Sequence, residues 1–216
     1  MEVFYRYAPF IQDYIYRSGW KTLRGVQNAA GDAIFGSEDN VLLTASTASG
    51  KTEAALFPIL TLLDEDPPQS VGVLYIAPLK ALINDQFGRL NELCEEEGIP
   101  VHRWHGDVAQ SRKRKLMKNP SGILQITPES LESLMINKHM EIPSLFGDLR
   151  FVVIDEIHSL LRGDRGMQSQ EDRTVGDHWE SGGRGEVPGS RQRAADGHSA
   201  VRERERSVAF VHGALF

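Results

Sequence analysis

The sequence of 216 residues contains one cysteine, Cys94, and therefore cannot form an internal disulfide bond. A single thiol is typical of a chain kept in a reducing compartment. The sequence also lacks any apolar run of roughly 18 residues, the length that a membrane-spanning helix needs. Its first residues, MEVFYRYAPF, have neither the basic start nor the apolar core of a secretory signal. These absences argue against a disulfide-stabilised secreted domain and a membrane protein, and they predict a cytoplasmic location.

An excess of positive charge is missing as well. The chain has 24 Lys and Arg against 30 Asp and Glu, so its formal net charge is −6. Any attraction to nucleic acid must therefore come from local groups. The most basic stretch, SRKRKLMK at 111–118, fits either a nucleic-acid contact or an ordinary solvated helix face, and the sequence leaves both open.

The last part of the chain lacks the residues from which cores are built. From Ser169 onward there is no Ile and no Lys, and Leu215 is the sole leucine, whereas Gly and Arg are frequent. A segment of this composition cannot bury enough apolar surface to form a packed layer. We therefore predict that residues 169–216 are an irregular tail.

Residues 1–168, in contrast, alternate short apolar runs with amphipathic stretches. The apolar runs, predicted to be buried strands, are 41–45, 71–77, 101–104, 123–127 and 151–155. The predicted helices between them are 51–63, 80–97, 108–117 and 128–137. This alternation predicts an α/β fold in which helices cover both faces of a mostly parallel sheet. Ligands of such sheets bind beyond the carboxyl ends of the strands.

The first predicted strand runs directly into ASTASGKT and then into a helix, which is the context that a phosphate-binding P-loop requires. Gly50 would let the backbone approach the phosphates, Lys51 would neutralise the β- and γ-phosphates, and the Thr52 hydroxyl would hold Mg²⁺. Ala45 and Ala48 stand where such loops often carry glycine, and alanine is the smallest replacement. The alternative is a chance Gly-Lys-Thr at a helix start. The predicted cradle consists of Ala45, Ser46, Thr47, Ala48, Ser49, Gly50, Lys51 and Thr52.

A second motif makes chance an unlikely explanation. In FVVIDEIH, four apolar residues lead to Asp155 and Glu156 at the carboxyl end of a predicted strand. P-loop ATPases need an aspartate in the Mg²⁺ shell and a carboxylate that orients or deprotonates the attacking water. We predict that Lys51, Asp155 and Glu156 are catalytic and that Thr52 and Asp155 hold the metal.

The motifs ASTASGKT, APLKAL, TPES and DEIH follow the order and spacing of motifs I, Ia, Ic and II of superfamily 2 helicases. Over residues 20–168 the sequence resembles the DEAD/DEAH-type and Lhr-like branches of that superfamily. The resemblance implies a RecA-like ATP-binding domain at 20–168, after a helical extension at 1–19 and before the irregular tail at 169–216. It also implies an ATP-dependent helicase that uses ATP and Mg²⁺ and binds one strand of DNA or RNA without reading its sequence.

The resemblance carries over to further residues. Gln27 matches the glutamine that reads adenine, since an amide can satisfy both a donor and an acceptor on the base. Phe10 and Trp20 are candidates for an aromatic that stacks on the base, although either could belong to the core. His158 matches the residue that couples the ATP state to a second domain. The residues that match the strand-contacting motifs Ia and Ic are Pro78, Leu79, Lys80, Ala81, Thr127, Pro128, Glu129 and Ser130.

Two features of the family are absent from the 216 residues: a Ser/Thr-Ala-Thr motif after the acidic box, and a second RecA-like domain with an arginine finger. The chain is therefore expected to be truncated and to turn ATP over negligibly by itself; the alternative is a non-catalytic nucleotide- or nucleic-acid-binding fragment. The composition break at Ser169 also fits an out-of-frame reading. A shift of one base in the degenerate codons of 195–199 allows Leu-Thr-Ala-Thr, and a genuine disordered tail remains the other explanation.

Overall fold

The computed structural model describes residues 2–37, 39–46, 49–95, 97–157 and 206–213. Three of the predicted site residues, Thr47, Ala48 and His158, lie outside these ranges, as does residue range 169–205. The predictions that concern them remain predictions.

The predicted strands and helices are present, with ends that agree to within about two residues. In chain order the elements are η1 (Val3–Arg6), α1 (Pro9–Arg17), α2 (Gly25–Gly36), β1 (Val41–Ser46), α3 (Lys51–Glu65), β2 (Val71–Ile76), α4 (Lys80–Glu95), β3 (Val101–Trp104), α5 (Gln110–Lys118), β4 (Gly122–Ile126), α6 (Pro128–Asn137), η2 (His139–Glu141), α7 (Ile142–Leu145), β5 (Phe151–Ile154) and β6 (Arg206–Gly213). No helix in the described ranges is long and apolar enough to cross a bilayer.

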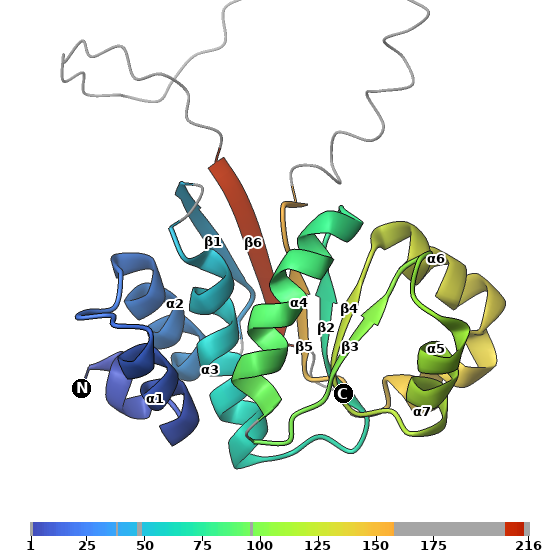
Figure 1. The fold of residues 1–216 in the computed structure, drawn as a ribbon. Helices are drawn as coiled ribbons and strands as arrows, with labels where there is room; N and C mark the ends of the chain where they lie inside the picture. Colours follow the sequence, from blue (N-terminus) through green and yellow to red (C-terminus); the bar gives the residue numbers. More distant parts are fainter. Residues whose placement is uncertain (1, 38, 47–48, 96, 158–205, 214–216) are drawn as a thin grey trace, which may run out of the picture.

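The strands form one sheet in the order β1-β6-β5-β2-β4-β3. The pairs β2–β5, β2–β4 and β3–β4 are parallel, whereas β6 runs antiparallel to both of its neighbours, β1 and β5 (Figure 1). The predicted α/β class with a mostly parallel, helix-covered sheet is therefore confirmed.

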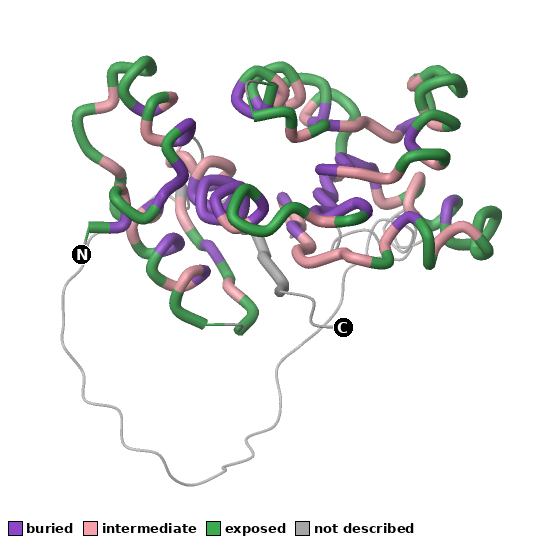
Figure 2. Tube along the Cα trace, turned by 90° about the horizontal axis from the view of Figure 1, so that it is seen from below, coloured by how far each residue is buried: buried purple, intermediate pink, exposed green. Residues whose placement is uncertain are grey.

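The two faces of the sheet are covered by different helices, and the period-2 alternation of the strands explains how. On β2, Val73 and Tyr75 belong to a core shared with α1, α2, α3 and α4, whereas Leu74 and Ile76 belong to a core shared with α5, α6 and α7. Successive side chains of a strand point to opposite faces, so a strand buried on both faces reads as one continuous apolar run. The buried positions lie in the interior of the trace and the exposed ones around it (Figure 2).

The N-terminal elements pack on the first of these cores. Phe10, Ile11 and Ile15 of α1 are buried in the same cluster as Phe57 of α3. The Ala8 backbone N–H donates to the Thr61 hydroxyl at 3.0 Å. Helices η1 and α1, which lie within the predicted extension at 1–19, thus share their core with the sheet domain.

The last described segment corrects one prediction. We expected all of 169–216 to be irregular, yet Arg206–Gly213 forms β6, paired with both β1 and β5. The overall composition of the tail hid a local run, SVAFV at 207–211, that is apolar enough for a strand. The backbone groups of β1 and β5 that face this slot need partners, and a strand in either direction supplies them.

Candidate ATP-binding site and nucleic-acid interface

The P-loop and the acidic box, about 100 residues apart in sequence, meet in one cavity of about 430 Å³. Ser49, Gly50, Lys51 and Thr52 line it from the start of α3, and Asp155 and Glu156 line it from the end of β5. The cavity lies beyond the carboxyl ends of β1 and β5, where α/β sheets bind their ligands.

The backbone of Gly50 favours glycine in this loop. Its φ of 82° lies in the left-handed region, and it is the N-cap of α3. A Cβ on Gly50 would come within 2.8 Å of Gln27 Nε2. The predicted adenine-reading amide therefore packs directly against the turn of the P-loop.

Two side chains at this loop carry buried polar atoms that lack partners among the described residues. Gln27 is fully buried; its Oε1 accepts from the Arg24 backbone N–H at 2.9 Å, whereas its Nε2 has no partner. The Ser49 hydroxyl is likewise buried without a partner. Buried polar atoms are rarely left unsatisfied, and such exceptions often mark the place of a ligand.

Lys51 is almost fully buried, at 8% exposure, and its Nζ donates to the Ala45 carbonyl at 3.1 Å. The ammonium group is thus folded back over the loop that the phosphates would enter. The N–H groups at the start of α3 add the positive end of the helix dipole to the same place.

Asp155 is held by two donors from other elements. The hydroxyl of Tyr75, on β2, donates to Asp155 Oδ2 at 2.7 Å, and Gln86 Nε2, on α4, donates to the same oxygen at 3.1 Å. Tyr75 is 1% exposed, and the Thr52 side chain lies near its hydroxyl. Burial, and next the charge of Asp155, raise the pKa of Tyr75 well above its usual value, so the hydroxyl keeps its proton. Tyr75 therefore positions the predicted Mg²⁺ ligand Asp155 close to Thr52.

Glu156 sits on unusual backbone. Its φ of 50° makes it the one non-glycine residue with positive φ in the described ranges, and its N–H donates to Asp155 Oδ1 at 3.0 Å. Such backbone conformations cost energy and concentrate at functional sites. Here the turn separates the two carboxylates, and both still line the same cavity.

The residues present suit a magnesium nucleotide. Three cationic side chains and three carboxylates line the cavity: Arg24, Lys51, Arg89, Glu53, Asp155 and Glu156. Oxygen ligands of the kind that Mg²⁺ prefers line the same cavity as cations that suit phosphates, and Ser49, with its unpartnered hydroxyl, belongs to that lining.

Residues 24–178 match the sequence family described as DEAD/DEAH box helicase. The chain belongs to the DEAD/DEAH box helicase family. The resemblance to Lhr-like helicases inferred from the four motifs is thereby confirmed at the level of the family.

Several relatives in this family match in sequence. ATP-dependent helicase Lhr-Core of Sulfolobus acidocaldarius is 37% identical over 141 residues, which is 59% of this chain and 16% of that protein. The uncharacterised ATP-dependent helicase YprA of Bacillus subtilis is 35% identical over 124 residues, or 56% of this chain and 16% of that protein. The chain spans between 7% and 20% of the length of such curated relatives.

A solved helicase structure agrees in fold. Helicase Lhr of Mycobacterium smegmatis, bound to ssDNA and AMP-PNP, superposes with a TM-score of 0.62 at 29% identity and covers 77% of this chain and 22% of its own. This likeness confirms the RecA-like DEAD/DEAH box fold.

The two predicted strand-contacting loops of the helicase family lie side by side. Motif Ia (Pro78–Ala81) follows β2, and motif Ic (Thr127–Ser130) follows β4, its parallel neighbour. The Ala77 N–H donates to the Ile126 carbonyl at 3.1 Å and ties the two strand ends together. Leu79, Lys80, Ala81 and Glu129 are exposed, whereas Thr127 is buried and bonds the Ser130 hydroxyl at 2.9 Å.

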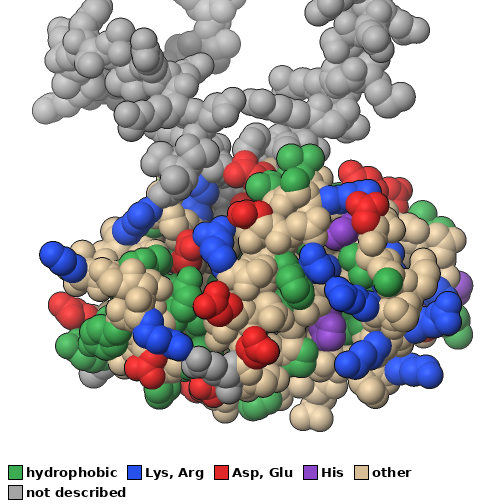
Figure 3. All heavy atoms as spheres, in the orientation of Figure 1, with side chains coloured by type: hydrophobic (Ala, Val, Ile, Leu, Met, Phe, Trp, Pro, Cys, Tyr) green, Lys and Arg blue, Asp and Glu red, His purple; other side chains and the backbone are tan. Residues whose placement is uncertain are grey.

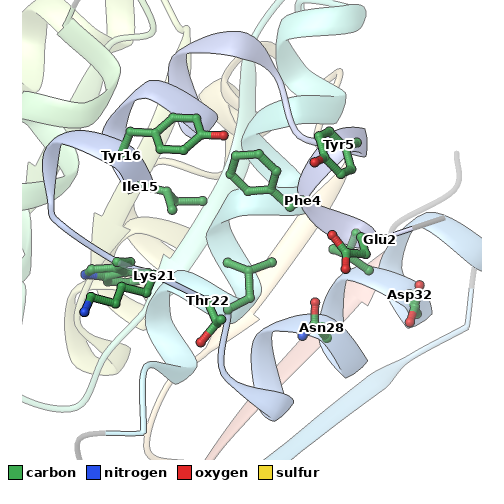
Figure 4. A pocket seen from close by; sticks show the side chains of 12 residues that line it. Glu2, Phe4, Tyr5, Ile15, Tyr16, Lys21, Thr22, Asn28 and Asp32 are labelled. Carbon is green, nitrogen blue, oxygen red and sulfur yellow. The ribbon is translucent and has the colours of Figure 1, made fainter.

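Phe10 and Trp20 are the two aromatic candidates for stacking on the base. Phe10 is a core residue at 5% exposure, whereas Trp20 lines the cavity shared by the P-loop and the acidic box. Trp20 also lines a second cavity, of about 510 Å³, formed by η1, α1, the segment before α2 and α2 itself. In that cavity Phe4 lies between Tyr5 and Tyr16, with Lys21 on one side of the mouth and Glu2 and Asp32 on the other (Figure 4). Trp20 therefore stands where the two cavities meet.

Sequence reasoning missed Tyr75, Gln86 and Arg24. Tyr75 lies inside an apolar strand and reads as core, and Gln86 lies inside a helix of mixed polarity. Arg24 precedes Gln27 by three residues and could have been found as a cation beside the adenine-reading position.

Proposed function

We propose that this chain is the ATP- and nucleic-acid-binding part of an ATP-dependent helicase of the Lhr-like type. The observation that carries the proposal is the single cavity shared by Gly50–Thr52 and by Asp155–Glu156. The two motifs have no reason to converge for stability alone, since acidic and basic side chains at a solvent-open cavity contribute little to folding.

Each residue has a defined task in this proposal. Lys51 leaves the Ala45 carbonyl and neutralises the β- and γ-phosphates, while Ser49 and the first N–H groups of α3 donate to phosphate oxygens. Thr52 and Asp155 would hold Mg²⁺, which would supply positive charge beside the phosphates. Glu156 orients the attacking water and accepts its proton. Trp20, Gln27 and Arg24 would hold the base: Trp20 by its ring, and Gln27 by its unpartnered Nε2.

Nucleic acid binds across the neighbouring loops of motifs Ia and Ic. Exposed Lys80 and the N–H groups at the start of α4 and α6 face backbone phosphates, which suits binding without sequence preference. His158 would relay the ATP state to a second RecA-like domain. Both relatives named above, Lhr-Core and YprA, are described as ATP-dependent helicases, and the M. smegmatis structure holds ssDNA.

The first test is binding. The 216-residue chain should bind a fluorescent ATP analogue in the presence of Mg²⁺ and bind it less tightly with EDTA, and it should bind single-stranded DNA or RNA weakly and with strong salt dependence. Absence of Mg²⁺-dependent analogue binding by a folded chain would refute the nucleotide site.

The second test is turnover. In this class of enzyme an arginine finger supplied by another domain or protein accelerates hydrolysis by roughly 10³–10⁵-fold. We expect the 216-residue chain to hydrolyse ATP negligibly, with or without oligonucleotide, and to separate no strands. Addition of a second RecA-like domain from a related helicase should raise turnover; a chain that binds ATP yet never responds would favour the non-catalytic alternative.

A further inference from the structure

A third cavity, of about 430 Å³, lies at the free edge of the sheet. Strand β3 is the last in the strand order and pairs with β4 alone among the described strands. The cavity lies between β3, α4 and α5, and no residue of the P-loop, the acidic box, motif Ia or motif Ic lines it. We call it the α4–α5 cavity.

The charge of the α4–α5 cavity is of one sign. Its lining includes four cations, Arg103, Arg112, Lys113 and Lys115, and no acidic side chain. Lys and Arg side chains also gather on the surface over β3 and α5, on the right of Figure 3. Acidic residues outnumber basic ones in the whole chain, which has a net charge of −6, so a cavity lined by four cations and no acidic residue differs from the overall composition. Like charges crowded together repel one another unless an anion joins them.

Two of these cations are held against aromatic rings. The Arg103 guanidinium stacks on Phe87 with 4.2 Å from Cζ to the ring centroid, and it donates to Asn84 Oδ1 at 2.8 Å. Lys113 Nζ lies 5.5 Å from the Trp104 ring centroid. A cation fixed in this way loses less entropy when it binds an anion.

His102 adds a donor or acceptor to the same lining. Its Nε2 is buried and has no hydrogen-bond partner among the described residues. Burial, and next the charge of Lys115, lower the pKa of His102, so its ring stays neutral in the free protein. The cavity therefore combines fixed cations with a neutral polar group.

The turn after β3 lies between motif Ia and the α4–α5 cavity and touches both. Lys80 of motif Ia pairs with Asp107 at 3.2 Å, and a Cβ on Gly106 would lie 3.3 Å from Lys80 Nζ. Val108, next in the chain after Asp107, lines the cavity. The turn after β3 thus leads from motif Ia to Arg112 and Lys113 along the same edge of the sheet. A nucleic-acid strand bound at motif Ia would therefore reach the cavity by following this turn.

We propose that the α4–α5 cavity is an additional phosphate-binding site that extends the nucleic-acid track beyond motifs Ia and Ic. Arg112, Lys113 and Lys115 bind backbone phosphates of a single strand, and Arg103 supplies the fixed guanidinium at the cavity wall. This inference rests on the proposed function, because it requires that a nucleic-acid strand crosses motif Ia. An acidic peptide would satisfy the same charges, but only the nucleic-acid strand accounts for the connection to motif Ia.

The experiment uses two double variants of α5 that remove the same charge. R112Q/K115Q changes two cations that line the cavity, whereas R114Q/K118Q changes two exposed cations of the same helix that do not. Affinity for a labelled oligothymidine is measured across a series of salt concentrations. Each phosphate contact to a single strand contributes about 0.7 to the slope of log K against log salt, so R112Q/K115Q should lower that slope by about 1.4. R114Q/K118Q should leave the slope close to that of the unaltered chain.

The outcomes separate this inference from the proposed function. Equal losses in the two variants would mean a diffuse charge effect and would overturn the cavity as a site. Displacement of the oligonucleotide by polyglutamate at equal charge concentration would overturn it in favour of an acidic peptide. An unaltered chain that binds the ATP analogue but no oligonucleotide would instead refute the nucleic-acid part of the proposed function. Analogue binding by R112Q/K115Q, expected to be unchanged, shows that this variant is folded.

Discussion

The cavity proposed to bind ATP and the α4–α5 cavity have nearly the same volume, about 430 Å³, but their linings differ in charge. The first mixes three cations with three carboxylates, and the second has four cations and no carboxylate. A magnesium nucleotide needs both signs, since its metal requires carboxylates while its phosphates require cations. A nucleic-acid backbone carries negative charge only, so its binding site requires only cations. The charge pattern of the lining, more than the size of the hollow, therefore distinguishes the two proposed ligands.

The largest expected effect comes from Lys51→Ala, which removes the ammonium proposed to bind the β- and γ-phosphates. We expect affinity for a fluorescent ATP analogue to fall at least about 100-fold, equivalent to roughly 3 kcal/mol. Oligonucleotide binding and its salt slope should be unchanged, because Lys51 does not line the α4–α5 cavity. Lys113→Ala serves as the converse control. Unchanged analogue affinity in Lys51→Ala would end the P-loop assignment.

A smaller effect, on both stability and binding, is expected from Gly50→Ala. The left-handed backbone at Gly50 should cost alanine about 1–2 kcal/mol of unfolding free energy, and the new Cβ must also displace Gln27 Nε2. Thermal denaturation and analogue titration measure the two effects. Gly36→Ala is the matched control, since a Cβ there meets no atom within 4 Å. Equal melting temperatures for the two variants would show that the loop tolerates a side chain.

The most specific effect is expected from Tyr75→Phe, which deletes the hydroxyl that donates to Asp155 Oδ2. Hydrogen bonds to charged groups contribute about 1.5–3 kcal/mol, so the Mg²⁺ concentration for half-maximal analogue binding should rise about tenfold. Analogue affinity at saturating Mg²⁺ should change little, which separates a positioning role from a loss of structure. Tyr16→Phe, at a 65% exposed residue, is the control. A uniform loss of affinity at every Mg²⁺ concentration would contradict the positioning role.

The sequence alone was sufficient to predict the helices and strands and to locate the motifs, because each of these depends on residues that are close together in the chain. Strand β3 was predicted at 101–104 and is found at Val101–Trp104, since an apolar run between turns defines it. The Tyr75–Asp155 bond, in contrast, joins residues 80 positions apart. It depends on β5 lying next to β2, and nothing in either strand specifies that neighbour. Strand order also explains why residues 206–213 form β6 although we expected an irregular tail. Strand β6 pairs with backbone groups of β1 and β5 that would otherwise be unpaired.

Strand β6 sets the distance between the two halves of the proposed ATP site. The P-loop follows β1 and the acidic box follows β5, and these two strands are not neighbours; β6 lies between them (Figure 1). Adjacent strands are spaced about 4.8 Å apart, so one intervening strand separates β1 from β5 by roughly 10 Å. The backbone ladder imposes this spacing whatever the direction of the middle strand. A nucleotide that contacts both Lys51 and Asp155 would span the middle strand and connect β1 with β5. Because such a ligand binds only the folded sheet, its binding would stabilise the pairing of β1, β6 and β5.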